Sequence, residues 1–571
     1  MKGILDRERS PPRRAITRTE LLLGVIIVYL LVKLYAPSKD VPSSTEEPLK
    51  EFFTCHAPHP HLLNNHEVDR SVFTKDISWL EKTLQNVIDG DSEYGNGTQS
   101  ITLSIFLPNG PPIFEAGYGK IRANESESPA PDGDSIYRMA SVTKMFTTAQ
   151  LLLQQQHGLI DLDQDVSTIL RDFRPSARGW SGMKHNRTIT TRQLLSHSSG
   201  LIRDEIRNMT WPSTPANNPN DTEQILKPSR ADVMASIEKT PAILPSYTVP
   251  IYSNVGFNVA GWVAEKIAGV KYADLLYRDI FEPLGMSSAS FKRQASKLDR
   301  VVVPAEPWSN WADFEMEDTD PAGGLYCSAA DLRRFGQELL GSGMESRATS
   351  EKTQTIFTKL TTREWLRPSY VFEDGLLSTG LSWQINTIPV NSRRMTLYTK
   401  GGTLPSFHTL FGIDPEREFG FSLLISGEPT AHNALSIRIA ERIATTLDGE
   451  RRKILDREFA GVYDDTPSDI IKIELHDGGL AVTKAVVNGT DLFDLLHLGE
   501  GEGGYVGLWP TGEHAVWRLA IGRPPAQPYL GCMLKFASID PAYANGYPVD
   551  LLIFEEGKLT YGSANLTLTR Q

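Results

Sequence analysis

The chain has 571 residues, of which 40% are hydrophobic and 22% are charged, and its formal net charge is −12. A chain of this length exceeds the size at which one hydrophobic core keeps growing, so we expect two domains or one large domain with additions. The acidic balance argues against nucleic acid as a partner, because phosphate binding requires clustered Lys and Arg side chains.

Residues 1–20 form a basic leader, and residues 21–36 form an apolar run whose only charged residue is Lys33. As a helix this run is about 24 Å long, which is short of a bilayer unless Lys33 reaches the interface. We expect a transmembrane signal anchor with its basic end in the cytoplasm. A cleavable signal peptide is the alternative.

Seven N-x-S/T sequons follow the apolar run, all on the side expected to be lumenal. Together with the leader they predict a glycosylated protein of the secretory pathway. The expected location is a single-pass membrane protein with a lumenal or extracellular catalytic domain, or a secreted protein if the leader is cleaved. The acceptor residues are Asn96, Asn124, Asn186, Asn208, Asn220, Asn488 and Asn565.

The chain has three cysteines, at positions 55, 327 and 532. They allow at most one internal disulfide and leave one thiol over, so the chain is not a disulfide scaffold. The sequence does not indicate which pair, if any, forms a bond.

Residues 37–75 are rich in Pro, Ser, Glu and His and have no periodic apolar pattern, which predicts a solvated stalk. A metal site on its histidines is the alternative interpretation. No carboxylate or cysteine pair at ligand spacing joins these histidines on a helix, so we predict no metal. The histidines are His56, His59, His61 and His66.

Ordered structure is predicted to begin near Asp76. Residues 100–107 alternate as in a strand, and residues 111–118 are the expected hairpin partner, with Asn109-Gly110 at a tight turn. Apolar periodicity predicts helices at 141–157, 257–268, 272–280 and 433–447.

Three other segments stand out. Gly158 is a natural stop for the helix that precedes it. Residues 203–230 are polar and rich in proline, which predicts a surface insertion. Residues 455–571 hold short alternating segments, such as 470–475 and 550–554, broken by Gly and Pro pairs, and predict a small all-β domain.

The site prediction starts from Ser141-Val-Thr-Lys144. On a helix, positions i and i+3 share a face, so the two side chains come within hydrogen-bond reach. Serine is a poor nucleophile until a base accepts its proton, and a lysine does so only when burial or nearby cations lower its pKa. The flanking residues 139–140 and 145–146 are apolar and supply that burial.

This pattern is weak alone, since Ser236-Ile-Glu-Lys239 has the same spacing. Two further motifs follow the first copy in order, one 111 residues after Ser141 and the other 148 residues beyond that. Ser236 lies only 16 residues before Tyr252, which leaves no room for the helical region that separates the first two motifs. The two motifs are Tyr252-Ser-Asn254 and Lys400-Gly401-Gly402.

The three motifs resemble those of class C β-lactamases, penicillin-binding DD-peptidases and related esterases, including fungal β-lactamase-like proteins with an extra C-terminal domain. The resemblance spans residues 76–448. It implies an α+β fold of the β-lactamase/transpeptidase type, with an antiparallel sheet flanked by helices, an all-helical region, and the site at their junction. Similar supporting segments are 158–163, 194–201, 283–286 and 322–328.

The resemblance also implies residue roles. Ser141 would be the acylated nucleophile, Lys144 would share or remove its proton, and Tyr252 would act as phenoxide or proton relay. Backbone N–H groups of Ser141 and Thr403 would form the oxyanion hole. His197 is expected to belong to a structural turn. The remaining substrate-binding residues would be Asn254, Lys400, Gly402 and Thr403.

One departure narrows the function. Gly401 stands where β-lactamases usually carry Thr or Ser, whose hydroxyl helps to hold the carboxylate of penicillin-like substrates. Hydrolysis of a small ester, amide or lactone through an acyl-enzyme is therefore favoured over true β-lactamase activity. No metal or organic cofactor is needed, and the expected partner is a small acyl substrate.

Two alternatives remain open. An acyltransferase that tailors a fungal secondary metabolite would use the same intermediate, so the motifs do not separate it from a hydrolase. A non-catalytic, membrane-anchored binding protein is disfavoured, because a silent copy would not need the full set of motif residues. The sequence leaves the physiological substrate and the oligomeric state undetermined.

Overall fold

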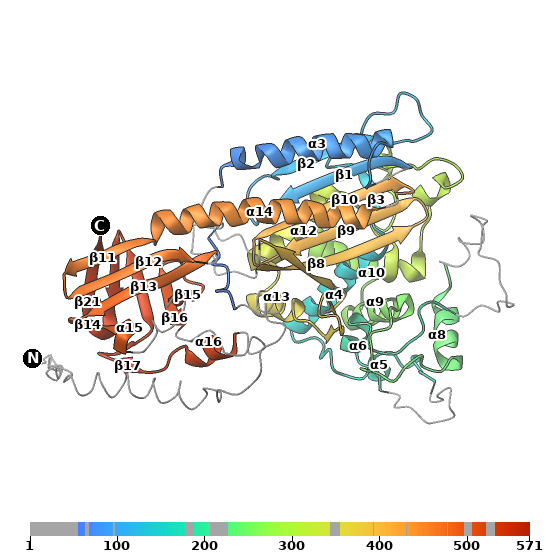
Figure 1. Ribbon diagram of the computed structural model, residues 1–571. Helices are drawn as coiled ribbons and strands as arrows, with labels where there is room; N and C mark the ends of the chain where they lie inside the picture. The colour runs from blue at the N-terminus through green and yellow to red at the C-terminus, as the bar shows by residue number, and fades with distance from the viewer. Residues whose placement is uncertain are drawn as a thin grey trace, which may run out of the picture. The chain divides into compact units, whose positions relative to one another are not determined.

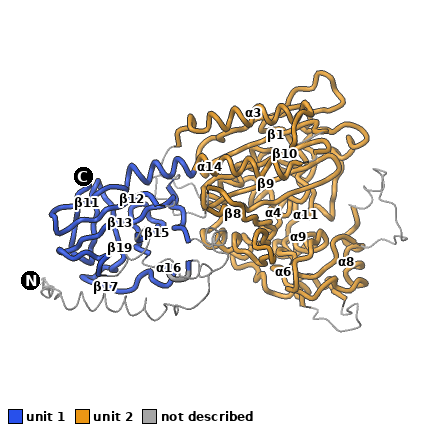
Figure 2. The backbone as a smooth tube through the Cα atoms, viewed as in Figure 1, with its two compact units in different colours: residues 1–62, 448–571 blue, residues 63–447 orange. Residues whose placement is uncertain are grey.

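The computed structural model describes residues 55–62, 68–94, 97–176, 188–205, 227–342, 355–391, 393–429, 431–476, 478–495, 505–520 and 532–571. The predicted leader, the apolar run 21–36 and most of the predicted stalk lie outside these residues. The chain divides into two compact units, residues 63–447 and residues 1–62 with 448–571 (Figure 2).

The unit of residues 63–447 is built on an eight-stranded sheet in the order β2-β1-β10-β9-β8-β7-β6-β5 (Figure 1). Every neighbouring pair is antiparallel. The central strands are buried along their length, as expected for a sheet covered on both faces. The strands are β1 (Thr98–Phe106), β2 (Phe114–Gly119), β5 (Tyr370–Val371), β6 (Leu377–Thr379), β7 (Gln384–Val390), β8 (Arg393–Leu404), β9 (Phe407–Asp414) and β10 (Phe419–Gly427).

Helices cover both faces of this sheet. On one face lie α3 (Thr74–Asp89) and the N-terminal part of α14 (His432–Glu458), which are joined through the buried Asp76 (Figure 1). Asp76 accepts a hydrogen bond from Thr446 at 2.6 Å and pairs with Arg442 at 2.8 Å. On the other face, α12 (Ala329–Ser342) packs against β1 and β10.

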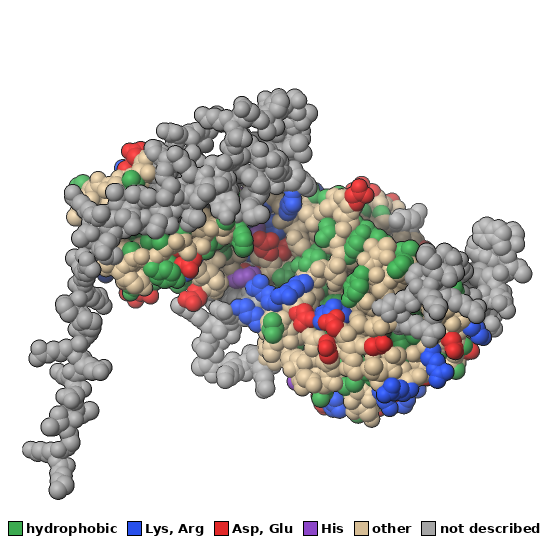
Figure 3. Space-filling model, turned by 90° about the horizontal axis from the view of Figure 1, so that it is seen from below, with side chains coloured by type: hydrophobic (Ala, Val, Ile, Leu, Met, Phe, Trp, Pro, Cys, Tyr) green, Lys and Arg blue, Asp and Glu red, His purple; other side chains and the backbone are tan. Residues whose placement is uncertain are grey.

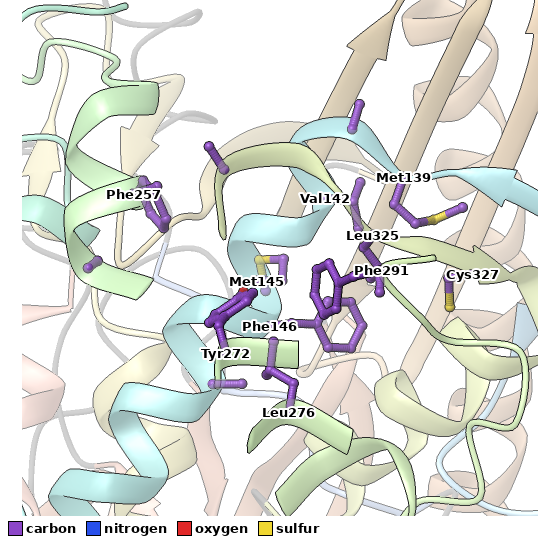
Figure 4. Close-up of a cluster of buried hydrophobic side chains, with 14 of the residues drawn as sticks. Met139, Val142, Met145, Phe146, Phe257, Tyr272, Leu276, Phe291, Leu325 and Cys327 are labelled. Carbon is purple, nitrogen blue, oxygen red and sulfur yellow. The ribbon is translucent and has the colours of Figure 1, made fainter. Parts of the chain in front are cut away.

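The helical region packs around α4 (Thr143–Gln156), in which residues 143–154 are all buried. Met145 and Phe146 of α4 lie among apolar side chains from several elements, including Tyr272 and Phe291 (Figure 4). Because this helix is buried on every side, its polar side chains need protein partners, and Thr147 bonds to Tyr272 Oη and to the carbonyl of Pro321. The neighbours of α4 are α9 (Asn254–Ala268), α11 (Asp320–Gly323) and α13 (Lys359–Trp365). Helices α6 (Thr191–Leu195) and α10 (Tyr272–Leu276) pack against α9.

This architecture confirms the predicted α+β fold, with an antiparallel sheet, flanking helices and an all-helical region. The predicted hairpin is present, since β1 pairs with β2, but Ile105 faces Phe114 across a loop longer than the expected tight turn at Asn109-Gly110. Gly158 ends its helix with φ +70°, as predicted. Of the predicted insertion 203–230, residues 206–226 lie outside the described residues.

Helix α14 corrects the predicted end at residue 447, because it continues to Glu458. The extension buries Arg451, Ile454 and Leu455, so packing carries the helix past Gly449, a residue that favours termination. The predicted helix at 272–280 also differs, since α10 ends at Leu276 and a π-helical turn, Tyr277–Phe281, follows.

The second unit confirms the predicted C-terminal β domain. Its sheet has the order β12-β11-β21-β20-β19-β16-β15-β13-β14, and β12 also pairs with β13, which closes all strands except β14 into an antiparallel barrel. The strands are β11 (Gly461–Thr466), β12 (Asp469–His476), β13 (Gly479–Val487), β14 (Thr490–Asp491), β15 (Val506–Pro510), β16 (Val516–Ala520), β19 (Leu551–Glu555), β20 (Lys558–Tyr561) and β21 (Leu566–Arg570).

The stalk prediction was wrong for residues 55–62, which belong to the barrel unit, and for residues 70–75, which form a 3-10 turn and the start of α3. Cys55 forms a disulfide with Cys532, and the carbonyl of Pro60 accepts a hydrogen bond from the buried Arg451. Leu62 is 1% exposed. The sequence of residues 55–62 has no apolar periodicity, so it gave no sign of the disulfide or of the buried contacts. Cys327 is the free thiol and is buried.

Three of the predicted glycosylation acceptors, Asn124, Asn488 and Asn565, are described, and all three are exposed. The other four lie outside the described residues.

Among the described helices, none is both long and apolar enough to cross a membrane. On the face shown in Figure 3, Lys and Arg side chains lie close to Asp and Glu side chains.

Candidate active site

Ser141 lies in a single turn of 3-10 helix, Ala140–Val142, that leads directly into α4. The turn follows strand β3 (Ile136–Arg138) and begins at Ala140 with φ +47°, a region that non-glycine residues rarely adopt. Such strain persists where the surrounding structure enforces it, and here the carbonyl of Ala140 accepts a hydrogen bond from Thr143 at 2.6 Å. Ser141 is thereby held at the N-terminus of α4.

Lys144 is completely buried one turn after Ser141, as the spacing predicts. Its ammonium group donates to Ser141 Oγ at 3.1 Å, to Asn254 Oδ1 at 2.7 Å and to the carbonyl of Ala322 at 2.6 Å. Burial lowers the pKa of Lys144 to about 8, with a smaller contribution in the same direction from Lys400. Lys144 is thus a fixed cation that can give up its proton near neutral pH.

Tyr252 lies against both lysines. Lys400 Nζ is 3.5 Å from the phenol oxygen, and Lys144 Nζ lies 5.2 Å from the ring centre. Burial alone would raise the pKa of Tyr252, but the two cations and hydrogen bonds from Ser141 and Lys144 lower it to about 7. The phenol oxygen can therefore accept a proton near neutral pH.

Asn254 begins helix α9, whose first turn is capped by Ser253. Its side-chain oxygen accepts from Lys144, and its side-chain nitrogen donates to Asp204 Oδ1 at 2.7 Å. The amide orientation is fixed from both sides. Asn254, which was expected to bind substrate, therefore contacts Lys144 through its oxygen, and its NH2 group already has a protein partner in Asp204. No sequence signal singles out Asp204, which stands at the start of the polar segment 203–230.

Strand β8 carries Lys400, Gly401, Gly402 and Thr403 past the serine turn. A Cβ atom on Gly402 would lie 2.3 Å from the carbonyl oxygen of Met139 and 2.9 Å from the amide nitrogen of Ser141. Only glycine permits this close approach. The strand is thereby held against the turn that carries the serine amide.

The pairing of β8 with β7 ends at Thr399, opposite Gln384. Over residues 400–404 the described strands pair with β8 on one side only, through β9. Thr403 also lines the same pocket as Ser141. This position suits the expected role of its N–H group as the second oxyanion donor.

The pocket beside Ser141 has a volume of about 470 Å³ including its open mouth. Apolar lining comes from Val255, Met316 and Leu404 among others. Among the described residues that line the pocket, the charged ones are two carboxylates, Asp204 and Glu205. Lys144 and Lys400 lie beside the nucleophile but do not line this pocket.

The competing motif lacks this environment. Ser236 and Lys239 lie on α8 (Arg230–Lys239), and Lys239 is exposed to solvent. Lys239 therefore lacks the burial that surrounds Lys144. The Ser236 motif therefore has no group suited to act as a base.

Comparison with known proteins identifies a family domain whose range contains all three motifs. A family model described as "Beta-lactamase" matches residues 104–445. The chain belongs to the beta-lactamase family. This beta-lactamase family member is 29% identical over 312 residues to "Beta-lactamase-like protein str6" of Strobilurus tenacellus, which covers 52% of this chain and 98% of that relative.

A second relative of this beta-lactamase family member is similar over more of the chain. "Probable hydrolase clz13" of Cochliobolus lunatus is 21% identical over 572 residues, covering 86% of this chain and 89% of that protein. A solved β-lactamase/D-alanine carboxypeptidase from Yersinia pestis has a TM-score of 0.51 at 17% identity, covering 66% of this chain and 99% of its own. At this identity the match concerns the fold alone.

Proposed function

We propose that the chain is a serine acyl hydrolase that cleaves a small ester, amide or lactone through an acyl-enzyme on Ser141. The observation that carries the proposal is the cluster of Ser141, Lys144, Tyr252 and Lys400, in which both lysines are buried. Burial lowers the pKa of Lys144 to about 8, and the two cations lower the pKa of Tyr252 to about 7. Groups poised near the working pH are suited to proton transfer. The chain's membership of the beta-lactamase family, a family of hydrolases, supports the same chemistry.

In the proposed reaction, Ser141 Oγ attacks the substrate carbonyl carbon while the Tyr252 phenolate accepts the hydroxyl proton. The amides of Ser141 and Thr403 stabilise the oxyanion. Collapse of the tetrahedral intermediate breaks the bond to the leaving group, which takes the proton back from Tyr252. Water then repeats the sequence on the acyl-enzyme, releasing the acid and restoring Ser141. Lys144 and Lys400 stabilise the phenolate throughout.

Covalent labelling tests the nucleophile. A fluorophosphonate is expected to add one adduct to the wild-type chain and to Ser236→Ala, and none to Ser141→Ala, because the phosphonyl group bonds only to an activated serine. Intact-mass and peptide mass spectrometry would locate the adduct. An adduct that persists in Ser141→Ala, or none in a folded wild-type chain, would reject the assignment.

We further propose that the substrate is neutral or cationic where it lies near Asp204 and Glu205. Asp204 pairs with the exposed Arg203 at 3.3 Å, which offsets part of its charge. A substrate carboxylate there is still expected to meet net repulsion from the two carboxylates, worth about 1 kcal/mol or roughly fivefold in kcat/KM. Aryl esters with matched neutral, cationic and anionic acyl chains are expected to rank with the anionic ester last. Glu205→Gln should reduce the difference in kcat/KM between the anionic ester and the neutral ester. An anionic ester hydrolysed fastest would contradict the proposal.

Acyl transfer remains the alternative use of the same intermediate. An added alcohol or amine that diverts acyl groups from water would identify a transferase, and unchanged hydrolysis would exclude it for that acceptor. A binding protein without catalysis would give no fluorophosphonate adduct at all. The two experiments together therefore separate the three functions.

We propose a secretory location with membrane attachment through residues 21–36. The Cys55–Cys532 disulfide supports an oxidising compartment, and the exposed Asn124, Asn488 and Asn565 are accessible to glycosylation. Chain expressed in a eukaryotic host is expected to lose mass on enzymatic removal of N-glycans and to remain in the membrane fraction after an alkaline carbonate wash. An unchanged mass would argue against this route.

A further inference from the structure

His197 follows helix α6 and adopts φ +58°, another left-handed conformation at a non-glycine residue. It contacts the chain on both sides of Tyr252. The carbonyl of His197 accepts from the amide of Ile251 at 2.8 Å, and its side-chain Nδ1 accepts from the amide of Ser253 at 3.1 Å. His197 therefore fixes the backbone immediately before and immediately after Tyr252.

The imidazole also contacts the Tyr252 ring directly. The two rings are stacked, with centroids 4.4 Å apart and planes 29° apart. Phe257 packs near the imidazole at 5.1 Å. An aromatic ring held in this way restricts how far the Tyr252 ring can tilt, and the tilt sets the distance from the phenol oxygen to Lys144 and Lys400.

The imidazole is neutral in this position. Because Nδ1 accepts a hydrogen bond, the proton of the neutral ring is on Nε2. Burial, followed by the charges of Lys144, Lys400 and Arg203, holds the pKa of His197 well below its usual range. Nε2 is buried and has no hydrogen-bond partner among the described residues. His197 thus neither adds a positive charge beside Tyr252 nor passes a proton through Nε2 to a described residue.

We infer that His197 is a positioning residue, which holds the Tyr252 ring against Lys144 and Lys400 by ring stacking, while its hydrogen bond to the Ser253 amide orients the imidazole for that stacking. This assignment rests on the proposed function and goes beyond the structural turn expected from the sequence. It concerns the placement of Tyr252, not a step that His197 performs on the substrate.

Two substitutions separate the contacts. His197→Phe keeps the stacked ring and removes the acceptor for the Ser253 amide, whereas His197→Asn removes the ring and keeps a polar side chain. Each is compared with wild type for the pH dependence of kcat/KM on a neutral ester and for thermal stability. Each is also paired with Tyr252→Phe, so that ultraviolet difference titration reports the ionisation of Tyr252 without turnover.

The groups that face Tyr252 are Lys144, Lys400, Arg203 and, through Asn254, Asp204. The base acts when deprotonated, so activity should rise with pH through about 7 in wild type. In His197→Asn, a Tyr252 ring that drifts from the cations should titrate about one pH unit higher, with kcat/KM reduced roughly tenfold at neutral pH. In His197→Phe the titration should stay close to wild type.

Three results would overturn the inference. The first is an unchanged Tyr252 titration in a folded His197→Asn. The second is an equal shift of the Tyr252 titration in both variants, which would show that the stacked ring does not set the pKa of Tyr252. The third is loss of the acid limb in His197→Phe, which would make His197 itself the titrating base. The ultraviolet titration decides these cases even if no ester is hydrolysed, so failure of the proposed function remains distinguishable.

Discussion

Replacing Lys144 by methionine is expected to lower kcat/KM for an ester substrate by roughly a thousandfold, within the range attributed to positioned proton transfer. Methionine fits a buried apolar site but removes the ammonium group that contacts Ser141, Asn254 and Ala322. Without this cation the pKa of Tyr252 should also rise, because Lys144 is the larger of the two charges that lower it. The measurement is steady-state hydrolysis together with the rate of fluorophosphonate labelling.

The matched control is Lys239→Met, at the same position of the competing Ser236 motif. Lys239 is exposed, so this variant should hydrolyse and label at the wild-type rate. Circular dichroism and thermal unfolding establish that Lys144→Met remains folded. A folded Lys144→Met with activity within a few-fold of wild type would contradict the assigned role of Lys144.

Substituting Gly402 by alanine is expected to reduce kcat by about a hundredfold to a thousandfold, the loss that follows removal of one oxyanion donor. The added methyl group would lie 2.3 Å from the carbonyl oxygen of Met139, so β8 must move away from the serine turn. That movement separates the amide of Thr403 from the amide of Ser141. Pre-steady-state measurement of acylation would show whether the loss falls on that step.

Gly401→Ala provides an unusually close control, because it places the same methyl group one residue away on the same strand. The nearest atoms to that Cβ are 3.9 Å distant, so no displacement of β8 is required. Acylation in Gly401→Ala should stay within a few-fold of wild type. Equal losses in the two variants would indicate a general effect on the strand rather than on the oxyanion donors.

Much of the candidate site could be predicted because most of its residues lie in three short sequence motifs. Ser141 and Lys144 are brought together by helical geometry alone, and the order of the three motifs distinguished this pair from Ser236 and Lys239. Asp204 could not be predicted in this way. It reaches Asn254 only through the fold, and carboxylates in polar segments are usually solvated.

Fold prediction succeeded where periodicity is strong and failed where long-range contacts decide. The helix beginning at Thr143 and the barrel strands follow local patterns. The extension of α14 beyond Gly449 depends instead on burial of Leu455, which no local pattern reveals. The segment around Cys55 was predicted to be a stalk. It is held instead by a disulfide to a residue 477 positions away, and a bond of that range leaves no local sequence pattern.

That bond also has a topological consequence. The disulfide between Cys55 and Cys532 turns everything from residue 55 to residue 532 into one covalent ring. A protease that cuts this ring once, for example in an exposed connection, opens it but sheds no fragment. The segment before Cys55 therefore stays attached to the catalytic residues after a single nick, and shedding requires a second cut or a reductant.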